Sequence, residues 1–567
     1  MSEEPMGDTP NEESVDDVDY PFGMNRRQWM KYFGVGGVTA GITSLAGCTG
    51  GDGGDGGDGG DGGDGGDGGD GGEERPFPLT PESTPSSWDG TELRWTTDNA
   101  AGPLYAMFGN VITEDTGGAL SFDDGQVLPP DNYYSKINSQ FVGGGSVPFD
   151  VVLHLPLYIG DFQARDIFEP MDSYLDKYNS DNIDEYLDGI IDTYKAFYTT
   201  WNGQTVSLPI DGDIHNLFYR PSFFNDETHQ EQYQDEYGEE LTVPETWPEF
   251  NRVAEYFTAN TEDGTYGTQV YGARPWNFGW WVDRAAALGM IYFDENMEPQ
   301  INSEAGVKAL EHMVQTVEYA PPETTQFGVA ETINQWQQGN VVMTPWWIDL
   351  TEFTARGDFP VVGDQSAAKM PGWEQDDGSI RFNACILYNR TYSVPASLSD
   401  KKKDAAFYAI LRLSHPDVSV YATADPFDGL DPFHEEHYTD KAAEQYTKPN
   451  PLRDTGEGFP KNVPIFAPDK EYPGGRSAFE QAKQHLAAGQ ANLENGFPQP
   501  NWPGASQYVE DLSIHIQRAL TGEESPQAAL DNAAEKWRTT RDELGRENQK
   551  KVYNREFLSK AEEFGYV

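Results

Sequence analysis

Cysteine is nearly absent from this sequence, which has two cysteines, Cys48 and Cys385, among 567 residues. A fold held together by disulfides is excluded, because such folds need several paired cysteines. The common zinc motifs are excluded as well, since the chain has no CxxC or HxxxH spacing. We therefore predict no metal-binding residues and no cofactor. Cys385 lies in the apolar run NACILY and is expected to be a small buried apolar side chain.

Basic residues are scarce, with 38 lysines and arginines against 95 aspartates and glutamates and a formal net charge of -57. This nearly excludes nucleic acid as a partner, because binding phosphates needs a basic face. The acidic excess is spread along the chain, which argues against a single acidic patch for a cationic partner. Such self-repulsion destabilises a fold at ordinary ionic strength, whereas molar salt shortens the Debye length to about 3 Å. The composition therefore predicts a halophilic surface.

Long apolar runs are also missing, and the strongest candidate, Phe33–Ala46, has only about 14 residues against the roughly 20 that span a bilayer. This run follows the pair Arg26 and Arg27 and ends in LAGC at Cys48, a pattern typical of an export signal with a lipobox. It resembles a twin-arginine signal, and an ordinary amphipathic helix is the alternative. We predict that residues 1–48 are a signal peptide, that Arg26 and Arg27 direct export, and that Cys48 carries the lipid.

Residues 49–90 have the composition of a spacer. Gly-Gly-Asp repeats run from Gly50 to Gly72, and the Pro-rich stretch PFPLTPESTPSSWDG follows. Glycine recurs too often for a packed element, and the repeat lacks the proline of a collagen helix. A Gly-rich chain of this length spans about 25–30 Å. We predict a disordered tether that holds a lipid-anchored domain away from a membrane.

Residues 91–567 are long enough for two domains, and their apolar periodicity alternates between the strand and helix types that an α/β protein requires. Three apolar runs predict strands, at 93–97, 150–155 and 341–343. Three helices are predicted from their first turns, because polar capping residues precede an apolar stripe. The capping signals are Thr246 with Glu249, Asn302 with Ser303, and Ser525 with Pro526.

Five segments occur in a characteristic order: KINSQFVGGGSVPFDVVL followed by GDFQARDIFEPMDSYL, then WNGQTVSLPIDGDIHNLFYR, PETWPEF, INQWQQGNVVMTPWWID and LTGEESPQAALDNAAEKW. Their order and spacing resemble the extracellular solute-binding proteins of ABC importers, in the carbohydrate branch that contains the maltodextrin-binding proteins. The resemblance covers nearly all of residues 91–567. Insertions at TADPFDGLDPFHEEHYTD and ANLENGFPQPNWPGASQYV, and the tail after Trp537, are more similar to the longer sugar- or polyol-binding members.

The resemblance implies an α/β fold of two lobes, periplasmic-binding-protein-like, with a hinge and a central ligand cleft. We expect residues 91–211 and about 375–440 in the first lobe, and residues 212–374 and about 441–567 in the second. The implied function is that of a monomeric protein on the extracellular face of the membrane. It would capture a sugar and deliver it to the permease subunits of an ABC transporter.

Sugar binding needs flat aromatic platforms and polar groups that donate and accept hydrogen bonds in fixed directions. The resemblance assigns Trp346 to stacking on a sugar ring and Asp213 to an acidic contact near the hinge. It also aligns Asp98 and Asn99 with polar residues at the end of the first strand. Seven further candidates are Trp276, Trp280, Trp281, Trp347, Tyr158, Asp431 and His434. Each has a structural alternative, since tryptophans fill cores, polar residues cap helices, and His434 fits a surface loop.

A secreted glycoside hydrolase with a carboxylate pair is the rival class. With 95 acidic residues, however, two neighbouring carboxylates carry no information. No GxSxG, P-loop or zinc signature is present either. We therefore predict a protein without catalytic residues. A polyol-binding or peptide-binding protein of an importer and an adhesion protein are the remaining alternatives.

Overall fold

The computed structural model describes residues 75–567, except 99–100, 124, 129, 143–147, 179, 262–263, 428 and 454–461. The predicted signal peptide with Arg26, Arg27 and Cys48, the Gly-Asp repeat and Asn99 lie outside the described residues. In the part of the chain that is described, no helix has the length and apolar character needed to cross a membrane.

Two sheets organise the molecule. The larger has the strand order β4-β2-β5-β15-β8. Its strands are β2 (Trp95–Asp98), β4 (Gln126–Leu128), β5 (Val151–His154), β8 (Leu208–Pro209) and β15 (Thr391–Ser393). β2 pairs in parallel with β4 and β5, whereas β15 pairs antiparallel with β5 and β8. The smaller sheet is antiparallel, in the order β10-β9-β11, with β9 (His215–Tyr219), β10 (Met343–Trp347) and β11 (Ser366–Ala368).

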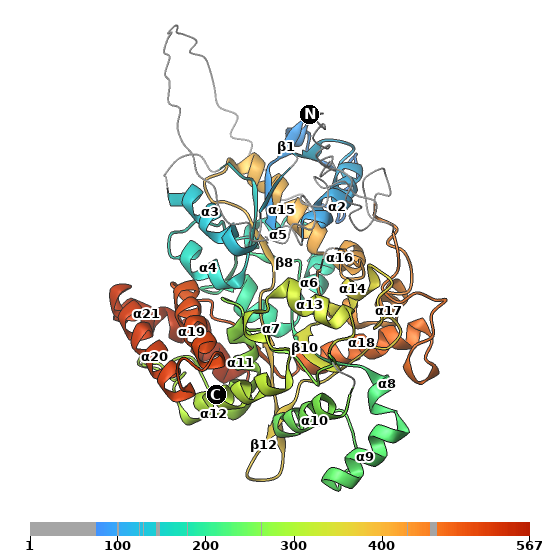
Figure 1. Cartoon of the computed structure of the whole chain (residues 1–567). Coiled ribbons are helices and arrows are strands. Elements are labelled where there is room, and N and C mark those ends of the chain that lie inside the picture. Colours follow the sequence, from blue (N-terminus) through green and yellow to red (C-terminus); the bar gives the residue numbers. More distant parts are fainter. Residues whose placement is uncertain are drawn as a thin grey trace, which may run out of the picture.

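Helices from two stretches of the chain, 102–194 and 400–422, accompany the larger sheet, and most of them lie in the upper part of Figure 1. They are α2 (Gly102–Asp115), α3 (Pro130–Val142), α4 (Pro156–Gln163), α5 (Asp172–Leu175), α6 (Ser180–Gly189), α7 (Asp192–Tyr194), α15 (Asp400–Ser414) and α16 (Pro416–Ala422). The helix α15 contacts α2, β8 and β1 (Thr91–Leu93), and β1 pairs in parallel with β3 (Leu120–Phe122). A segment late in the sequence therefore completes the domain that begins the fold.

The smaller sheet lies among the helices in the lower part of Figure 1. They are α8 (Pro221–Phe224), α9 (Glu227–Tyr237), α10 (Trp247–Asn260), α11 (Asn277–Ala285), α12 (Glu304–Thr316), α13 (Val329–Gln337), α14 (Leu350–Ala355), α17 (Asp440–Gln445), α18 (Ala478–Leu493) and α19 (Ala505–Leu520). The helix α11 is buried along its whole length and contacts α12 and α19. No face of it meets water, which suits its apolar and aromatic residues, and its buried Asp283 pairs with His215 at 2.9 Å.

The three helices predicted from capping signals are confirmed. Thr246 and Glu249 form a capping box at the start of α10. The Ser303 side chain accepts a hydrogen bond from the backbone N–H of Gly306 in α12, and Ser525 caps α20 (Pro526–Glu543). The predicted strands at 93–97 and 150–155 are present as β1, β2 and β5. Of the run at 341–343 only Met343 lies in β10, which continues to Trp347.

Two segments connect the parts of the molecule that contain the two sheets, and a third segment packs against one of these connections. Residues 210–214 connect β8 to β9, and residues 387–390 connect β14 (Ala384–Ile386) to β15. The strand β14 pairs with β16 (Gly496–Pro498) and contacts α11 and β9, so it packs with the smaller sheet. We therefore propose that the lobe boundary lies near residue 387 rather than at about 375. The third segment, 423–434, follows α16 and contacts residues 210–214.

The predicted tether ends earlier than expected, because residues 75–90 pack on the larger-sheet domain. Phe77, Leu79 and Trp88 are buried in the main core. Arg75 forms an ion pair with Asp404 of α15 at 2.9 Å. Apolar side chains that a spacer does not need explain this correction, since burying each one stabilises the ordered state.

The C-terminal tail contacts segments that we assigned to different lobes. The helix α20 packs on α19, and α21 (Arg546–Tyr553) follows it. The hydroxyl of Tyr553 donates a hydrogen bond to the Phe293 carbonyl at 2.8 Å. Beyond it, Lys560 in α22 (Ser559–Glu563) donates to the Ala196 carbonyl at 2.5 Å. The tail therefore bridges the two parts of the molecule.

Candidate functional site

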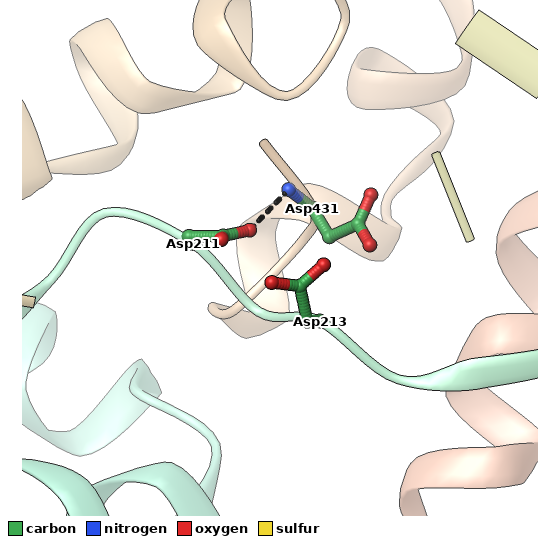
Figure 2. Close-up of side chains that lie close together, drawn as sticks. All are labelled: Asp211, Asp213 and Asp431. Atoms are coloured by element: carbon green, nitrogen blue, oxygen red, sulfur yellow. Dashed lines mark hydrogen bonds between the residues drawn. The ribbon is translucent and has the colours of Figure 1, made fainter. Parts of the chain in front are cut away.

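An acidic cluster forms where the crossing segments meet. Asp211 and Asp213 lie between β8 and β9, and Asp431 lies in the segment after α16. The backbone N–H of Asp431 donates to the Asp211 carboxylate at 2.8 Å, and the N–H of Gly212 donates to the Asp431 carbonyl at 2.9 Å. Carboxylate oxygens of the three aspartates lie within 4.8 Å of one another, and Figure 2 shows the Asp213 carboxylate turned towards that of Asp431.

Glycine at position 212 allows this approach. A Cβ atom there would lie 2.1 Å from the carbonyl oxygen of Pro432, far inside van der Waals contact with rigid backbone. Any other residue would push the two segments apart. The spacing of Asp211 and Asp213 from Asp431 therefore depends on Gly212.

Arg390 links this cluster to the end of strand β2. Its guanidinium group forms ion pairs with Asp98 at 2.8 Å and Asp213 at 3.6 Å, and it donates a hydrogen bond to Asp211. The same group lies over the Tyr388 ring, 4.7 Å from its centroid. Tyr388 in turn donates its hydroxyl to Asp98 at 3.3 Å. One arginine thus connects strand β2, the segment after β8 and the crossing before β15.

The cluster holds more acidic groups than Arg390 compensates. Burial raises the pKa of Asp213 well above its usual range, and Asp211 and Asp431 raise it further, while Arg390 lowers it. Burial is also the main cause that raises the pKa of Asp431. The pKa of Asp349 is raised to about 7, first by burial and then by Asp211. Chemically, such a site favours protons, cations or the hydroxyl donors of a polar ligand.

Aromatic side chains line the neighbouring end of β10. The Trp346 ring lies 5.8 Å from Tyr271 and 5.1 Å from Trp347, and Trp280 stacks on Tyr271 at 4.3 Å. Trp346 is among the groups that lower the pKa of Asp349, which places this indole beside the acidic groups, although its N–H has no hydrogen-bond partner among the described residues. Aromatic rings next to carboxylates are the combination that carbohydrate ligands require.

Most of the predicted site residues fall in or near this region. Trp276 packs edge-on against Tyr388 at 4.9 Å, so it lies next to Arg390. Tyr158 is buried on α4 and acts on the pKa of Tyr388. Trp347 and Trp280 flank Trp346 but donate their indole N–H groups to backbone carbonyls, at 2.9 and 3.1 Å.

Two predicted residues, Trp281 and His434, are buried and bonded to backbone groups outside the acidic cluster. Trp281 is fully buried and donates to the Gly306 carbonyl at 2.9 Å, so it fills the contact between α11 and α12. His434 is not a surface residue, because it is 4% exposed. Its Nε2 pairs with the Tyr186 carbonyl at 3.0 Å, and its Nδ1 accepts from the Glu436 backbone at 3.1 Å. Burial lowers the pKa of His434 to about 4, so the ring is neutral near pH 7.

Sequence reasoning missed Asp211, Asn389, Arg390 and Asp349. Asn389 donates its backbone N–H to Asp213 at 3.0 Å. Tyr388 and Asn389 both have positive φ, 81° and 49°, a strained backbone that is common at functional sites. The signal available was the sequence YNR between two apolar runs, since an arginine there must find acidic partners when it is buried.

The comparisons with known proteins agree with this architecture. Residues 106–411 match a family model described as bacterial extracellular solute-binding protein. The mannitol-binding protein of Pseudomonas aeruginosa is 26% identical over 216 residues, which cover 36% of this chain and 44% of that protein. The match thus spans less than half the length of that relative.

Solved structures of solute-binding proteins share the fold. Maltose-bound MalE3 of T. maritima has a TM-score of 0.60 at 18% identity, covering 79% of this chain and 99% of that one. A ribitol complex from Agrobacterium radiobacter K84 has a TM-score of 0.59 at 19% identity, covering 80% and 99%. A D-mannitol complex from Agrobacterium vitis S4 has a TM-score of 0.56 at 17% identity, again covering 80% and 99%. The predicted two-lobe α/β fold is confirmed by this likeness.

Proposed function

Because the chain belongs to the bacterial extracellular solute-binding protein family, we propose that it captures a sugar or polyol outside the cell and delivers it to an ABC permease. The observation that carries the proposal is the meeting of buried carboxylates and indole rings at the crossing segments, where Asp213 and Trp346 converge on Asp349 and Asp431. Solute-binding proteins close two lobes over a ligand at such a position. Maltose, ribitol and D-mannitol in the related structures support a polyhydroxy ligand.

Each site residue has a role in this proposal. Trp346 supplies the flat face on which a sugar ring or carbon chain stacks, and Asp213 accepts hydrogen bonds from hydroxyl groups. Asp98 and Trp276 approach from the side of Arg390 and Tyr388. The protein changes no bond in its ligand, because a solute-binding protein only captures and releases.

A thermal-shift screen of mono-, di- and oligosaccharides and polyols in molar salt identifies the ligand, because binding to the native state raises its stability. Calorimetry then compares wild type with Trp346→Ala and Asp213→Asn. Stacking and a charge-assisted hydrogen bond are each worth about 1–3 kcal/mol, so we expect Kd to rise about 5- to 150-fold.

Two control variants separate binding from folding. Asp235→Asn makes the same chemical change on the exposed face of α9, and Trp281→Phe perturbs a buried indole outside the cluster. Both should keep the wild-type Kd, although Trp281→Phe should lower the melting temperature. Wild-type affinity in the Trp346 and Asp213 variants would remove these residues from the site. Chemical turnover of the sugar would favour the hydrolase, and a shift with peptides alone would favour a peptide-binding protein.

We also propose that the protein is a monomer held at the extracellular face of the cell membrane by a lipid on Cys48. Its export would depend on Arg26 and Arg27. The LAGC sequence and the Gly-Asp repeat support this anchoring. A single acyl chain binds a membrane only marginally, so a second lipid or signal is expected. Cys48→Ser should move most of the protein from the membrane fraction to the medium, as measured by immunoblot of both fractions. Unchanged membrane association of that variant would refute the anchor.

A further inference from the structure

Asp431 is a buried carboxylate without a protein partner. It is 0% exposed, and neither of its carboxylate oxygens has a hydrogen-bond partner among the described residues. Its backbone is fully engaged, since the N–H donates to Asp211 and the carbonyl accepts from Gly212. These two bonds hold the backbone of Asp431 against Asp211 and Gly212. A carboxyl taken out of water in this way either holds a proton or needs a counter-charge.

Arg390 does not supply that counter-charge. It forms ion pairs with Asp98, Asp211 and Asp213, and none with Asp431 in the part of the chain described. The Nη1 group that contacts Asp211 also donates a hydrogen bond to the Gly429 carbonyl at 3.1 Å. The Asp431 carboxylate therefore has no guanidinium partner among the described residues.

The geometry of the three carboxylates matches a cation with oxygen ligands. Their oxygens lie within 4.8 Å of one another, and they come from two segments joined by backbone hydrogen bonds. An ion with metal–oxygen distances of about 2.4 Å contacts oxygens that are at most about 4.8 Å apart. Carboxylates are the ligands preferred by hard divalent ions such as Ca²⁺ and Mg²⁺.

We propose that Asp211, Asp213 and Asp431 bind one divalent cation, with Ca²⁺ as the best-fitting ion. The ion would supply the charge that Arg390 leaves uncompensated, and it would hold the segment 211–213 against the segment around Asp431. Ca²⁺ tolerates irregular coordination with water or ligand hydroxyls in the open positions, whereas Mg²⁺ requires a near-ideal octahedron. The protein would therefore bind a divalent cation as well as a neutral solute.

Equilibrium dialysis of the chelator-stripped full chain in molar potassium chloride, with Ca²⁺ alone as the probe, tests the site. We expect one tightly held ion per chain above the weak background of surface carboxylates. Asp431→Asn should weaken this binding by more than the roughly 10- to 100-fold that changing an outer-shell partner of a metal costs. Asp235→Asn, the matched exposed variant on α9, should bind as wild type does.

Melting curves keep the test decisive if a variant folds poorly. Ca²⁺ should raise the melting temperature of wild type and of Asp235→Asn but leave that of Asp431→Asn unchanged. Without Ca²⁺, Asp431→Asn should melt no lower than wild type, because the Asp431 side chain has no hydrogen bond to lose among the described residues. Equal ion content in wild type and Asp431→Asn, or no response of wild type to Ca²⁺, Mg²⁺ or Mn²⁺, would overturn the proposal. The assay contains no sugar, so its outcome is independent of the sugar-binding proposal.

Discussion

At the scale of single residues, Arg390 is the side chain on which the site depends most. It is buried and bonded to three aspartates that approach from two different elements. Desolvating an arginine is unfavourable, but the surrounding carboxylates raise its pKa well above the usual value, so it stays charged. Removing one partner of such a network leaves the other charges buried and unpaired.

Arg390→Met should therefore lower the free energy of unfolding by about 3–5 kcal/mol, as measured by urea denaturation at constant molar salt. Arg390→Lys should lie between this variant and wild type, because lysine keeps the charge but lacks the planar fork. The control is Lys448→Met, which removes an exposed i,i+4 pair with Glu444. That change should cost no more than about 0.5 kcal/mol. Equal urea midpoints for Arg390→Met and Lys448→Met would show that the network is not needed for stability.

At the scale of elements, the capped helices begin where nearby side chains accept hydrogen bonds from the backbone N–H groups of the first turn. In α10 the Thr246 side chain accepts from the Glu249 backbone at 3.3 Å, and Glu249 accepts from the Thr246 backbone at 3.0 Å. Both bonds lie within four residues of sequence, so they form with little loss of chain entropy. This is why such helix starts can be recognised without knowing the fold.

Thr246→Ala should cost about 1 kcal/mol of stability, because one N-terminal amide of α10 loses its partner. Thr242→Ala, an exposed threonine four residues earlier, should leave the urea midpoint within error. The comparison is valid because both substitutions remove the same atoms. A loss of similar size in the two variants would mean that the cap contributes nothing.

At the scale of the whole molecule, the net charge of -57 sets the conditions for folding. The Debye length is about 3 Å at 1 M salt and about 30 Å at 0.01 M, so repulsion between surface carboxylates acts across the molecule only in dilute salt. The charge therefore predicts a fold that depends on ionic strength.

The melting temperature, followed by circular dichroism, should fall steeply between 1 M and 0.01 M potassium chloride. Choline chloride at the same ionic strength should protect to a similar extent, because screening depends on ionic strength rather than on the identity of the cation. Protection by potassium alone would point to specific ion binding. An unchanged melting temperature over the whole range would contradict a halophilic surface.

The sequence by itself determined the features whose causes are local or additive. The capped helices follow from residues three or four positions apart, and the burial of Cys385 follows from the apolar run around it. The fold was predicted through resemblance, which rests on the order of several segments, whereas the ligand-binding roles of Asp213 and Trp346 stay predictions. Residues 75–90 were misjudged, since proline-rich composition outweighed the apolar side chains that bury them.

Only the tertiary structure decided what the acidic residues do. Arg390 meets Asp98 across 292 sequence positions and Asp211 across 179, and Asp431 reaches Asp211 across 220. In a chain with 95 acidic residues, no local pattern distinguishes these few from those that only hydrate the surface. The distinction arises from burial, which removes water from a carboxylate and makes its neighbours matter. The carboxylates are buried only because three segments pack together, so the sequence of any one segment does not show the burial.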